Sequence, residues 1–174
     1  DLRGSGIATL AEWLDRERIT VLHVVATVFR EICKRLPPAR VLPYVRMLVV
    51  AGEPVFASDV ERYRAHMPVH CVLVNQLAST EVGLIAQQRF DHDDRLPAGA
   101  VLPVGRSPRG VGVTIRREDG SAAGVDEVGE IVVTSAHVSP GYWRRPELDS
   151  AAFADDPQQP GARSYRSGDL GRLD

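Results

Sequence analysis

Hydrophobic and polar positions follow two alternating periodicities in the first half of the chain. Apolar residues recur at helical spacing over residues 7–14, and a β-branched run follows at residues 19–21. A second helical stripe extends over residues 24–36, and apolar, strand-like runs occupy residues 47–50 and 71–74. Because helices that alternate with strands typically cover a sheet, this pattern predicts an α/β fold in which helices cover a sheet.

A further helix is expected after the run at residues 47–50. Ser58 and Glu61 have the spacing of a capping box, in which each side chain satisfies an amide at the start of a helix. From Leu84 onward the pattern changes to short β-like runs separated by Pro and Gly. The runs at residues 111–115 and 130–134 predict an antiparallel meander.

The last helix is predicted at residues 146–153, since Pro146 is favoured in a first turn, where its missing amide hydrogen costs nothing. We therefore expect an α/β part at residues 1–90 and a β-rich, barrel-like part at residues 91–174. The chain begins with Asp1 rather than Met and stops without a closing signal. Both parts are therefore expected to belong to one larger domain that is truncated at both ends.

Amino-acid composition limits the partners and reactions that this chain can have. The 174 residues include 21 Lys and Arg against 23 Asp and Glu, which gives a nucleic-acid partner no support. Apolar runs are much shorter than the roughly 20 residues of a membrane span, and no signal sequence is evident, so we expect no membrane partner and no secretion. Cys33 and Cys71 lie in apolar runs, which favours buried thiols and a cytoplasmic, reducing setting. Lys34 is the one lysine, so a mechanism that needs another must obtain it elsewhere.

Three polar segments follow strand-like runs, and ligands of α/β sheets gather at the carboxyl ends of strands. In the first segment, residues 51–54, Gly52 allows close approach of a flat ligand and Glu53 can anchor polar groups. The alternative is a turn with an acidic residue at the start of a helix, and the segment taken alone favours that turn.

The second segment, residues 75–81, carries hydroxyl groups and a carboxylate. Ser79 and Thr80 can bind phosphate oxygens, while Glu81 can hold a Mg²⁺ ion that shields the same charge. A helix cap formed by Ser79 or Thr80 is an equally compatible interpretation.

The third segment, residues 165–170, contains Asp169 next to a glycine. A carboxylate at the edge of a sheet can accept two hydrogen bonds from a ribose diol, as the acid of dinucleotide sites does. The alternative is a surface hairpin with Gly168 and Asp169 as its turn.

Together and in this order, the segments resemble the motifs of the adenylate-forming superfamily, most closely those of nonribosomal peptide synthetase adenylation domains. Residues 51–53 resemble the Gly-Gly-Glu adenine loop, residues 75–81 the Asn-x-Tyr-Gly-Pro-Thr-Glu signature, and residues 165–170 the Tyr-Arg-Thr-Gly-Asp-Leu motif. Residues 19–24 are similar to the strand that enters the acyl pocket, and residues 129–131 and 139–143 to the Gly-Glu-Ile/Leu segment that ends in Gly-Tyr. The resemblance extends from about residue 19 to the end of the chain.

The resemblance implies activation of a carboxylic acid, most closely an amino acid, by ATP to an acyl adenylate. The acyl group would then pass to a phosphopantetheine thiol on a carrier-protein domain. Thr80 would contact the α-phosphate and the acyl carboxylate, Glu81 would bind Mg²⁺, and Asp169 would hold the ribose hydroxyls. The implied adenine-bordering residues are Gly52, Glu53 and Asn75, and the implied acyl-pocket residues are Thr27, Val49, Ala51, Gln76, Leu84 and Ile85.

Two other functions remain open. An acyl-CoA or fatty-acyl-AMP ligase shares these motifs and differs in the acyl pocket and the final acceptor. A nucleotide-binding or interaction module without turnover is the alternative of another class, since Leu77 replaces the family's usual aromatic ring and Ala51 replaces a glycine. The family's Gly-rich phosphate loop ending in Lys does not occur, nor does the small carboxyl-terminal domain with its catalytic lysine. We therefore expect this chain alone to be inactive.

Two histidine-containing segments are assigned no chemistry. Residues 91–94 carry three aspartates and a histidine, but adjacent ligands cannot all face one ion, so a solvated loop is predicted. His23 lies in an apolar run, where it either lines a pocket or belongs to the core.

Overall fold

The protein is described by a computed structural model that covers residues 6, 9–157 and 159–174. The chain forms two compact units that interleave along the sequence: unit 1 comprises Asp1–Leu77 and Gln87–Arg106, and unit 2 comprises Ala78–Ala86 and Ser107–Asp174. Each unit is described by itself. The expected division into parts at residues 1–90 and 91–174 of one larger domain stays a prediction.

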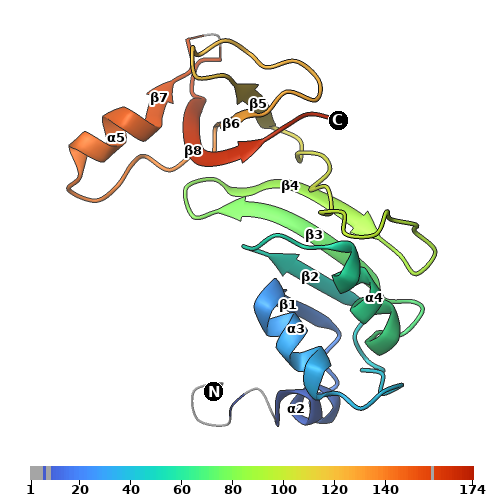
Figure 1. Cartoon of the computed structure of the whole chain (residues 1–174). Helices are drawn as coiled ribbons and strands as arrows, with labels where there is room; N and C mark the ends of the chain where they lie inside the picture. Colours follow the sequence, from blue (N-terminus) through green and yellow to red (C-terminus); the bar gives the residue numbers. More distant parts are fainter. Residues whose placement is uncertain (1–5, 7–8, 158) are drawn as a thin grey trace. The chain divides into compact units, whose positions relative to one another are not determined.

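Unit 1 is built on a parallel sheet. Strands β1 (Val21–Val25), β2 (Met47–Ala51) and β3 (Val72–Ser79) run parallel, and β4 (Gly83–Phe90) follows β3 in the sheet order β1-β2-β3-β4. The end of β3 and the first half of β4 belong to unit 2. The strand predicted at residues 19–21 lies instead at Val21–Val25, as β1. Val24 was expected to begin the next helix, but it pairs with Val50 in the sheet. The expected α/β class is confirmed (Figure 1).

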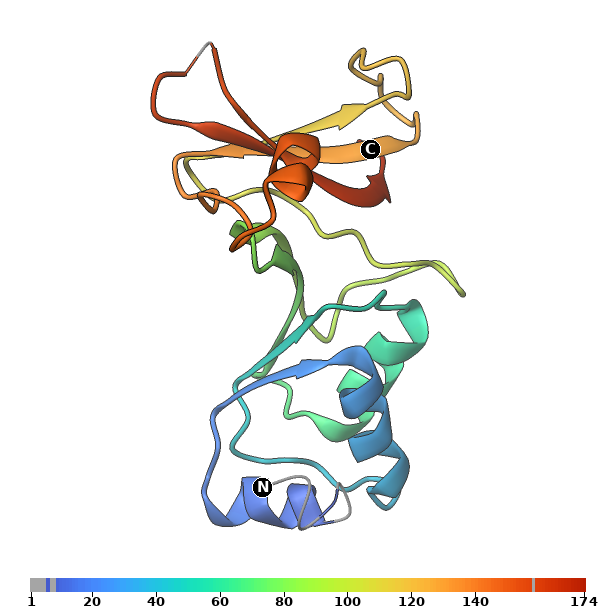
Figure 2. The same cartoon turned by 90° about the vertical axis from the view of Figure 1, so that its left-hand side faces the viewer.

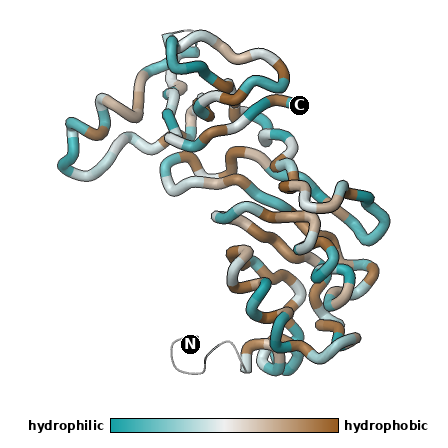
Figure 3. Tube along the Cα trace, in the orientation of Figure 1, coloured by the Kyte–Doolittle hydropathy of each residue, from teal (hydrophilic) through white to brown (hydrophobic). Residues whose placement is uncertain are grey.

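Helices cover one face of this sheet. The helices are α2 (Leu10–Arg16), α3 (Ala26–Arg35) and α4 (Ala57–His66), and residues 7 and 8 of the first predicted helix lie outside the described residues. Figure 2 shows α3 and α4 on the same side of the strands. The core on that side contains the fully buried Phe29 of α3, Leu48 of β2 and Tyr63 of α4. Hydrophobic residues are frequent along these elements (Figure 3). Burial of each such side chain contributes about 1.5–3 kcal/mol.

The capping box predicted from Ser58 and Glu61 is wrong. Helix α4 begins at Ala57, so Ser58 already lies within its first turn. The backbone N–H of Phe56 donates instead to Asp59 Oδ2 at 3.0 Å. The side chain that reaches back to the start of the helix is therefore that of Asp59.

Asp59 also forms an ion pair that joins α4 to α3. Arg30 Nε and Nη2 donate to the two carboxylate oxygens of Asp59 at 2.9 and 2.7 Å, and Nη2 also donates to the Pro54 carbonyl at 2.9 Å. The Asp59 side chain is 1% exposed and that of Arg30 is 25% exposed. Burial alone would raise the pKa of Asp59, but the hydrogen bonds from Arg30 and from the Phe56 amide lower it. The pair therefore anchors the loop after β2.

Replacing Asp59 with asparagine is expected to lower the free energy of unfolding by about 2 kcal/mol at pH 7, since it removes the charge that Arg30 hydrogen-bonds. A carboxylate with a lowered pKa stabilises the fold above its unfolded-state pKa of about 4, and this stabilisation is lost as the pH falls through the folded-state value. The difference between the two proteins should therefore disappear in acid. Urea unfolding at pH 7 and pH 2.5 measures it.

Glu31→Gln is the matched control, because Glu31 pairs with Lys34 and Arg35 at the surface of α3 and exposed pairs contribute little. Equal urea midpoints for Asp59→Asn and the unmodified chain at pH 7 would show that the Arg30 pair does not stabilise unit 1.

Unit 2 contains an antiparallel sheet in the order β5-β6-β8-β7. Its elements are β5 (Val111–Arg116), β6 (Gly129–Ser135), helix α5 (Pro146–Ala152), β7 (Phe153–Asp155) and β8 (Arg163–Gly171). The meander of β5 and β6 and the helix that begins at Pro146 are confirmed. The barrel-like expectation is corrected, because the described strands form an open sheet with β5 and β7 at its edges.

Across residues 6, 9–157 and 159–174, no helix is both long and apolar enough to cross a membrane.

Candidate functional site

The first predicted segment is a loop held at the amino terminus of α3. Gly52 follows β2 with a φ of 79°, a conformation that favours glycine. Glu53 Oε2 accepts hydrogen bonds from the Thr27 backbone N–H at 2.7 Å and from the Thr27 hydroxyl at 2.6 Å. These bonds lower the pKa of Glu53. The Glu53 carboxylate therefore hydrogen-bonds to the first turn of α3, the preceding helix, and not to the start of α4.

This contact joins two residues that were assigned to different ligands. Thr27 is implied in the acyl pocket and Glu53 beside adenine, yet they hydrogen-bond to each other within unit 1. The Thr27 hydroxyl is thus already hydrogen-bonded within the protein. Two consecutive residues hold the loop after β2: Glu53 bonds to Thr27, and the Pro54 carbonyl accepts a hydrogen bond from Arg30.

Asn75 is buried within β3 instead of ending the strand. Its side chain is 3% exposed, and Nδ2 donates to the Leu102 and Pro103 carbonyls at 3.1 and 3.0 Å. The amide therefore ties β3 to the segment that follows residue 100. Its role beside adenine stays a prediction.

Three acyl-pocket candidates share the sheet face that the helices leave open. Ala51 pairs in register with Gln76, and Val49 pairs with Val74. Successive side chains of a strand alternate between faces, so Val49 and Ala51 lie opposite the buried Leu48 and Val50. The predicted positions Val49, Ala51 and Gln76 are therefore brought together.

His23 belongs to the same open face and was missed as a site residue. It pairs in register with Val49, and its side chain is exposed. The core interpretation of His23 is therefore wrong. The signal that could have found it is strand periodicity, because His23 shares a face with the exposed Val21 and Val25, whereas the buried Leu22 lies on the opposite face.

The second segment is a hairpin and not a loop after a short strand. β3 continues through Ser79, residues 80–82 form a turn, and β4 starts at Gly83. The helix-cap alternative is wrong because a strand follows the turn. Thr80 is exposed and Glu81 is half-buried. On β4, Leu84 is half-buried whereas Ile85 is 1% exposed, so Leu84 is the more accessible of the two pocket candidates.

Glu81 lies among hydroxyl groups within unit 2. Its Oε1 accepts a hydrogen bond from the Tyr142 hydroxyl at 2.8 Å, and its backbone carbonyl accepts one from the Ser139 N–H at 2.7 Å. Burial would raise the pKa of Glu81, but hydrogen bonds, the one from the Tyr142 hydroxyl above all, lower it. The carboxylate is therefore held in its anionic form.

The surroundings of Glu81 fit a Mg²⁺ ion that is bound partly by the protein and partly by a substrate. Mg²⁺ commonly takes one or two carboxylates together with waters and substrate phosphates, and needs no all-protein cage. In the described part of the chain, no group of three or more His, Cys, Asp or Glu side chains could hold a metal by itself. Residues 91–94 form a turn in which the Asp91 carboxylate accepts the amides of Asp93 and Asp94, as predicted for a solvated loop.

The third segment lies within a strand. Gly168 and Asp169 belong to β8, which pairs with β6, so the hairpin alternative is wrong. The register shifts between Glu130 and Val132, and Gly168 has a φ of 76° at this irregularity. Ser167 Oγ accepts the Asp169 N–H at 3.0 Å and its hydroxyl donates to the Ile131 carbonyl at 2.9 Å. The exposed Asp169 side chain therefore projects from a fixed backbone.

Comparison with known proteins agrees with these motifs. The profile of the family described as AMP-binding enzyme matches residues 3–143. The chain belongs to this family of adenylate-forming enzymes. The resemblance to nonribosomal peptide synthetase adenylation domains is confirmed as well, since relatives of that kind align over nearly the whole chain.

Three examples illustrate this family membership. The nonribosomal peptide synthetase agiA of Aspergillus flavus is 34% identical over 96% of this chain, which spans 2% of that protein. Gramicidin S synthase 1 of Brevibacillus brevis is 27% identical over 92% of this chain, which spans 14% of it. The crystal structure of the nonribosomal peptide synthetase FmoA3 superimposes with a TM-score of 0.84 at 26% identity, covering 96% of this chain and 18% of that one.

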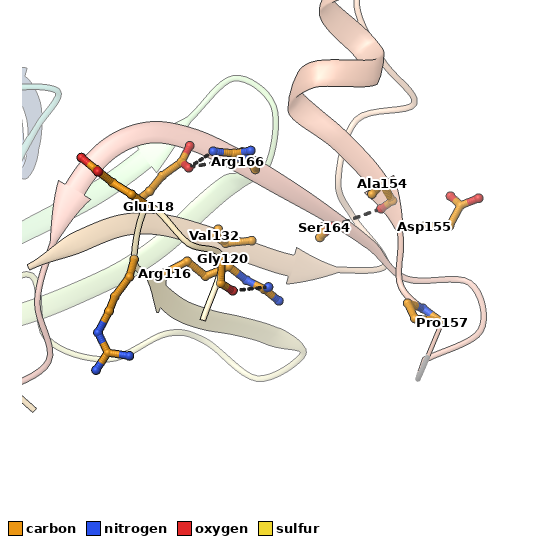
Figure 4. Close-up of a pocket in the computed structure, with 11 residues that line it drawn as sticks. Arg116, Glu118, Gly120, Val132, Ala154, Asp155, Pro157, Ser164 and Arg166 are labelled. Carbon is orange, nitrogen blue, oxygen red and sulfur yellow. Dashed lines mark hydrogen bonds and ion pairs between the residues drawn. The ribbon is translucent and has the colours of Figure 1, made fainter. Parts of the chain in front are cut away.

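A separate depression of about 360 Å³ lies on the sheet of unit 2 (Figure 4). Arg116, Arg166, Glu130 and Asp155 are among its lining residues, and Arg166 forms an ion pair with Glu130 at 2.5 Å. None of the predicted site residues lines it. Since its charges offset one another, it offers no clear preference for a charged ligand.

Proposed function

We propose that this chain supplies ATP- and carboxylate-binding residues to an enzyme that activates an amino acid as its acyl adenylate. The observation that carries the proposal is Glu81, an anionic carboxylate held by a hydroxyl at a hairpin turn, directly after the exposed Thr80. These two residues lie in the segment that resembles the family's phosphate and metal motif.

The proposed reaction joins the substrate carboxylate to the α-phosphorus of ATP. A carboxylate oxygen forms the new bond to phosphorus, the bond between this phosphorus and the bridging oxygen breaks, and pyrophosphate leaves with the electron pair. The Thr80 hydroxyl would contact the α-phosphate and the acyl carboxylate, and Glu81 would hold Mg²⁺. When bound, Mg²⁺ neutralises phosphate charge. Asp169 would accept hydrogen bonds from the ribose hydroxyls, while Gly52, Glu53 and Asn75 would border adenine.

The acyl side chain is proposed to meet the open face of the parallel sheet. Val49, Ala51 and Gln76 share that face, and His23 joins them as a polar group. The resemblance adds Thr27, Leu84 and Ile85 to the residues proposed to select the acyl group. For Thr27, the hydrogen bonds to Glu53 support an additional role in holding the loop beside adenine.

The acceptor separates the two enzymatic alternatives. An adenylation domain passes its acyl group to the phosphopantetheine thiol of a carrier domain with release of AMP, whereas an acyl-CoA ligase uses the thiol of coenzyme A. Labelled amino acids and fatty acids are therefore offered to the longer polypeptide that the resemblance implies, with either acceptor. Amino-acid label on the carrier domain supports the proposal, and fatty-acyl label on coenzyme A contradicts it.

This chain alone is expected to show no ATP–pyrophosphate exchange. Its single lysine, Lys34, lies in the last turn of α3 and pairs with Glu31 at 2.6 Å, at the opposite end of that helix from the Thr27 contact with Glu53. No other lysine is present to neutralise the phosphates. Exchange by the purified 174-residue chain, above that of a Glu81→Gln control, would contradict this expectation.

A further inference from the structure

Two tyrosines lie beside the Glu81 carboxylate. Tyr142 Oη donates to Glu81 Oε1 at 2.8 Å, across 61 positions of sequence. Burial raises the pKa of Tyr165, and the neighbouring Tyr142 hydroxyl and Glu81 carboxylate raise it further. The three groups belong to three separate motifs of the sequence, and all lie within unit 2.

Aromatic packing fixes the two tyrosine rings. The Phe153 ring lies 5.2 Å from the Tyr142 ring in an edge-on arrangement and 5.2 Å from the Tyr165 ring. Phe153 and Tyr165 are each 6% exposed. Because ring packing would remain after loss of a hydroxyl group, a Tyr→Phe substitution separates the hydrogen bond from the packing.

The backbone around Glu81 is fixed independently of Tyr142. Ser139 N–H donates to the Glu81 carbonyl at 2.7 Å, and Arg163 Nη1 donates to the Ser139 carbonyl at 2.8 Å. The position of the turn therefore does not depend on the tyrosine hydroxyl. What the hydroxyl determines is the direction of the Glu81 carboxylate.

We propose that Tyr142 is a positioning residue that presents the Glu81 carboxylate to Mg²⁺. This inference rests on the proposed metal role of Glu81. Hydrogen-bond partners of metal ligands orient those ligands, and their loss typically weakens metal binding by about 10- to 100-fold.

The test uses the chain itself with Mn²⁺–ATP as the probe. Water-proton relaxation enhancement measures binding of Mn²⁺–ATP, and calorimetry in EDTA measures binding of metal-free ATP. Tyr142→Phe is expected to weaken Mn²⁺–ATP binding about tenfold and to leave metal-free ATP binding unchanged. A purely structural role would weaken both. Tyr44→Phe, which removes the hydroxyl of an exposed tyrosine in unit 1, is the matched control.

Tyr165→Phe provides a second variant. Tyr142 makes the direct hydrogen bond to Glu81, so Tyr165→Phe is expected to weaken Mn²⁺–ATP binding less than Tyr142→Phe does. An equal or larger loss in Tyr165→Phe would contradict the assignment of the positioning role to Tyr142.

Glu81→Gln separates this inference from the proposed function. Loss of Mn²⁺–ATP binding in Glu81→Gln with unchanged binding in Tyr142→Phe would overturn the positioning role and leave the metal role of Glu81 intact. Unchanged binding in Glu81→Gln, or failure of the unmodified chain to bind Mn²⁺–ATP, would contradict the metal role itself.

Discussion

Replacement of Glu81 by glutamine is expected to lower Mg²⁺-dependent adenylate formation by the longer polypeptide about 100-fold. Glutamine keeps the size of the side chain and an acceptor for Tyr142 Oη, so the hairpin turn should persist. What is lost is the negative charge that hydrogen bonds maintain in the folded chain. The loss should be partly recovered at high Mg²⁺ concentration, because the variant is impaired in holding the ion.

The measurement is the initial rate of adenylate formation as a function of Mg²⁺ concentration. Asp93→Asn serves as the control, since it removes one carboxylate from an exposed loop. A Glu81→Gln enzyme with the Mg²⁺ dependence of the unmodified enzyme would show that the metal is held elsewhere.

Replacement of Asp169 by alanine is expected to raise the apparent KM for ATP about 10- to 100-fold. A hydrogen bond to a charged group contributes about 1.5–3 kcal/mol, which corresponds to this range. The bonds of Ser167 to the Asp169 amide and the Ile131 carbonyl should keep β8 in place, because they do not involve the lost carboxylate. Most of the effect should therefore fall on nucleotide binding.

Deoxynucleotides distinguish a ribose contact from a general loss of structure. The unmodified enzyme should prefer ATP over 2′-deoxy-ATP, and Asp169→Ala should reduce this preference. Asp126→Ala, which removes an exposed carboxylate elsewhere in unit 2, should leave the preference unchanged. An undiminished preference for ATP in Asp169→Ala would mean that Asp169 does not bind the ribose diol.

The sequence correctly predicted those helices and strands that depend on residues close to them in the chain. Helix α5 begins at Pro146 because proline suits a first turn, and α3 ends at Arg35, just before Leu36 and the two prolines that follow. The antiparallel pairing of β5 with β6 also followed from two nearby extended runs.

Failures occurred where a distant partner decides the conformation. The polar Asn75 looked like the end of a strand, but its amide is satisfied by carbonyls 27 and 28 residues away, so β3 continues through it. The alternative of a hairpin turn at Gly168 and Asp169 fails because β6 pairs with this part of β8. Sequence spacing does not reveal such pairings.

In the candidate site, too, the motifs were predicted from the sequence, whereas contacts between distant residues were not. The motifs containing Thr80, Glu81 and Asp169 were visible in the sequence, since their residue types and order are distinctive. The contact of Thr27 with Glu53 was not predictable, because it joins residues 26 positions apart through a helix terminus. His23 was missed because a single histidine in an apolar run does not reveal which face of the sheet it occupies.

We propose that this chain carries residues of an ATP-dependent, carboxylate-activating site. Exchange of radiolabelled pyrophosphate into ATP by the longer polypeptide tests this proposal most directly. We expect exchange that requires both an amino acid and Mg²⁺ and that falls about 100-fold in Glu81→Gln. No exchange with any amino acid, aryl acid or fatty acid, or exchange that Glu81→Gln leaves unchanged, would contradict it.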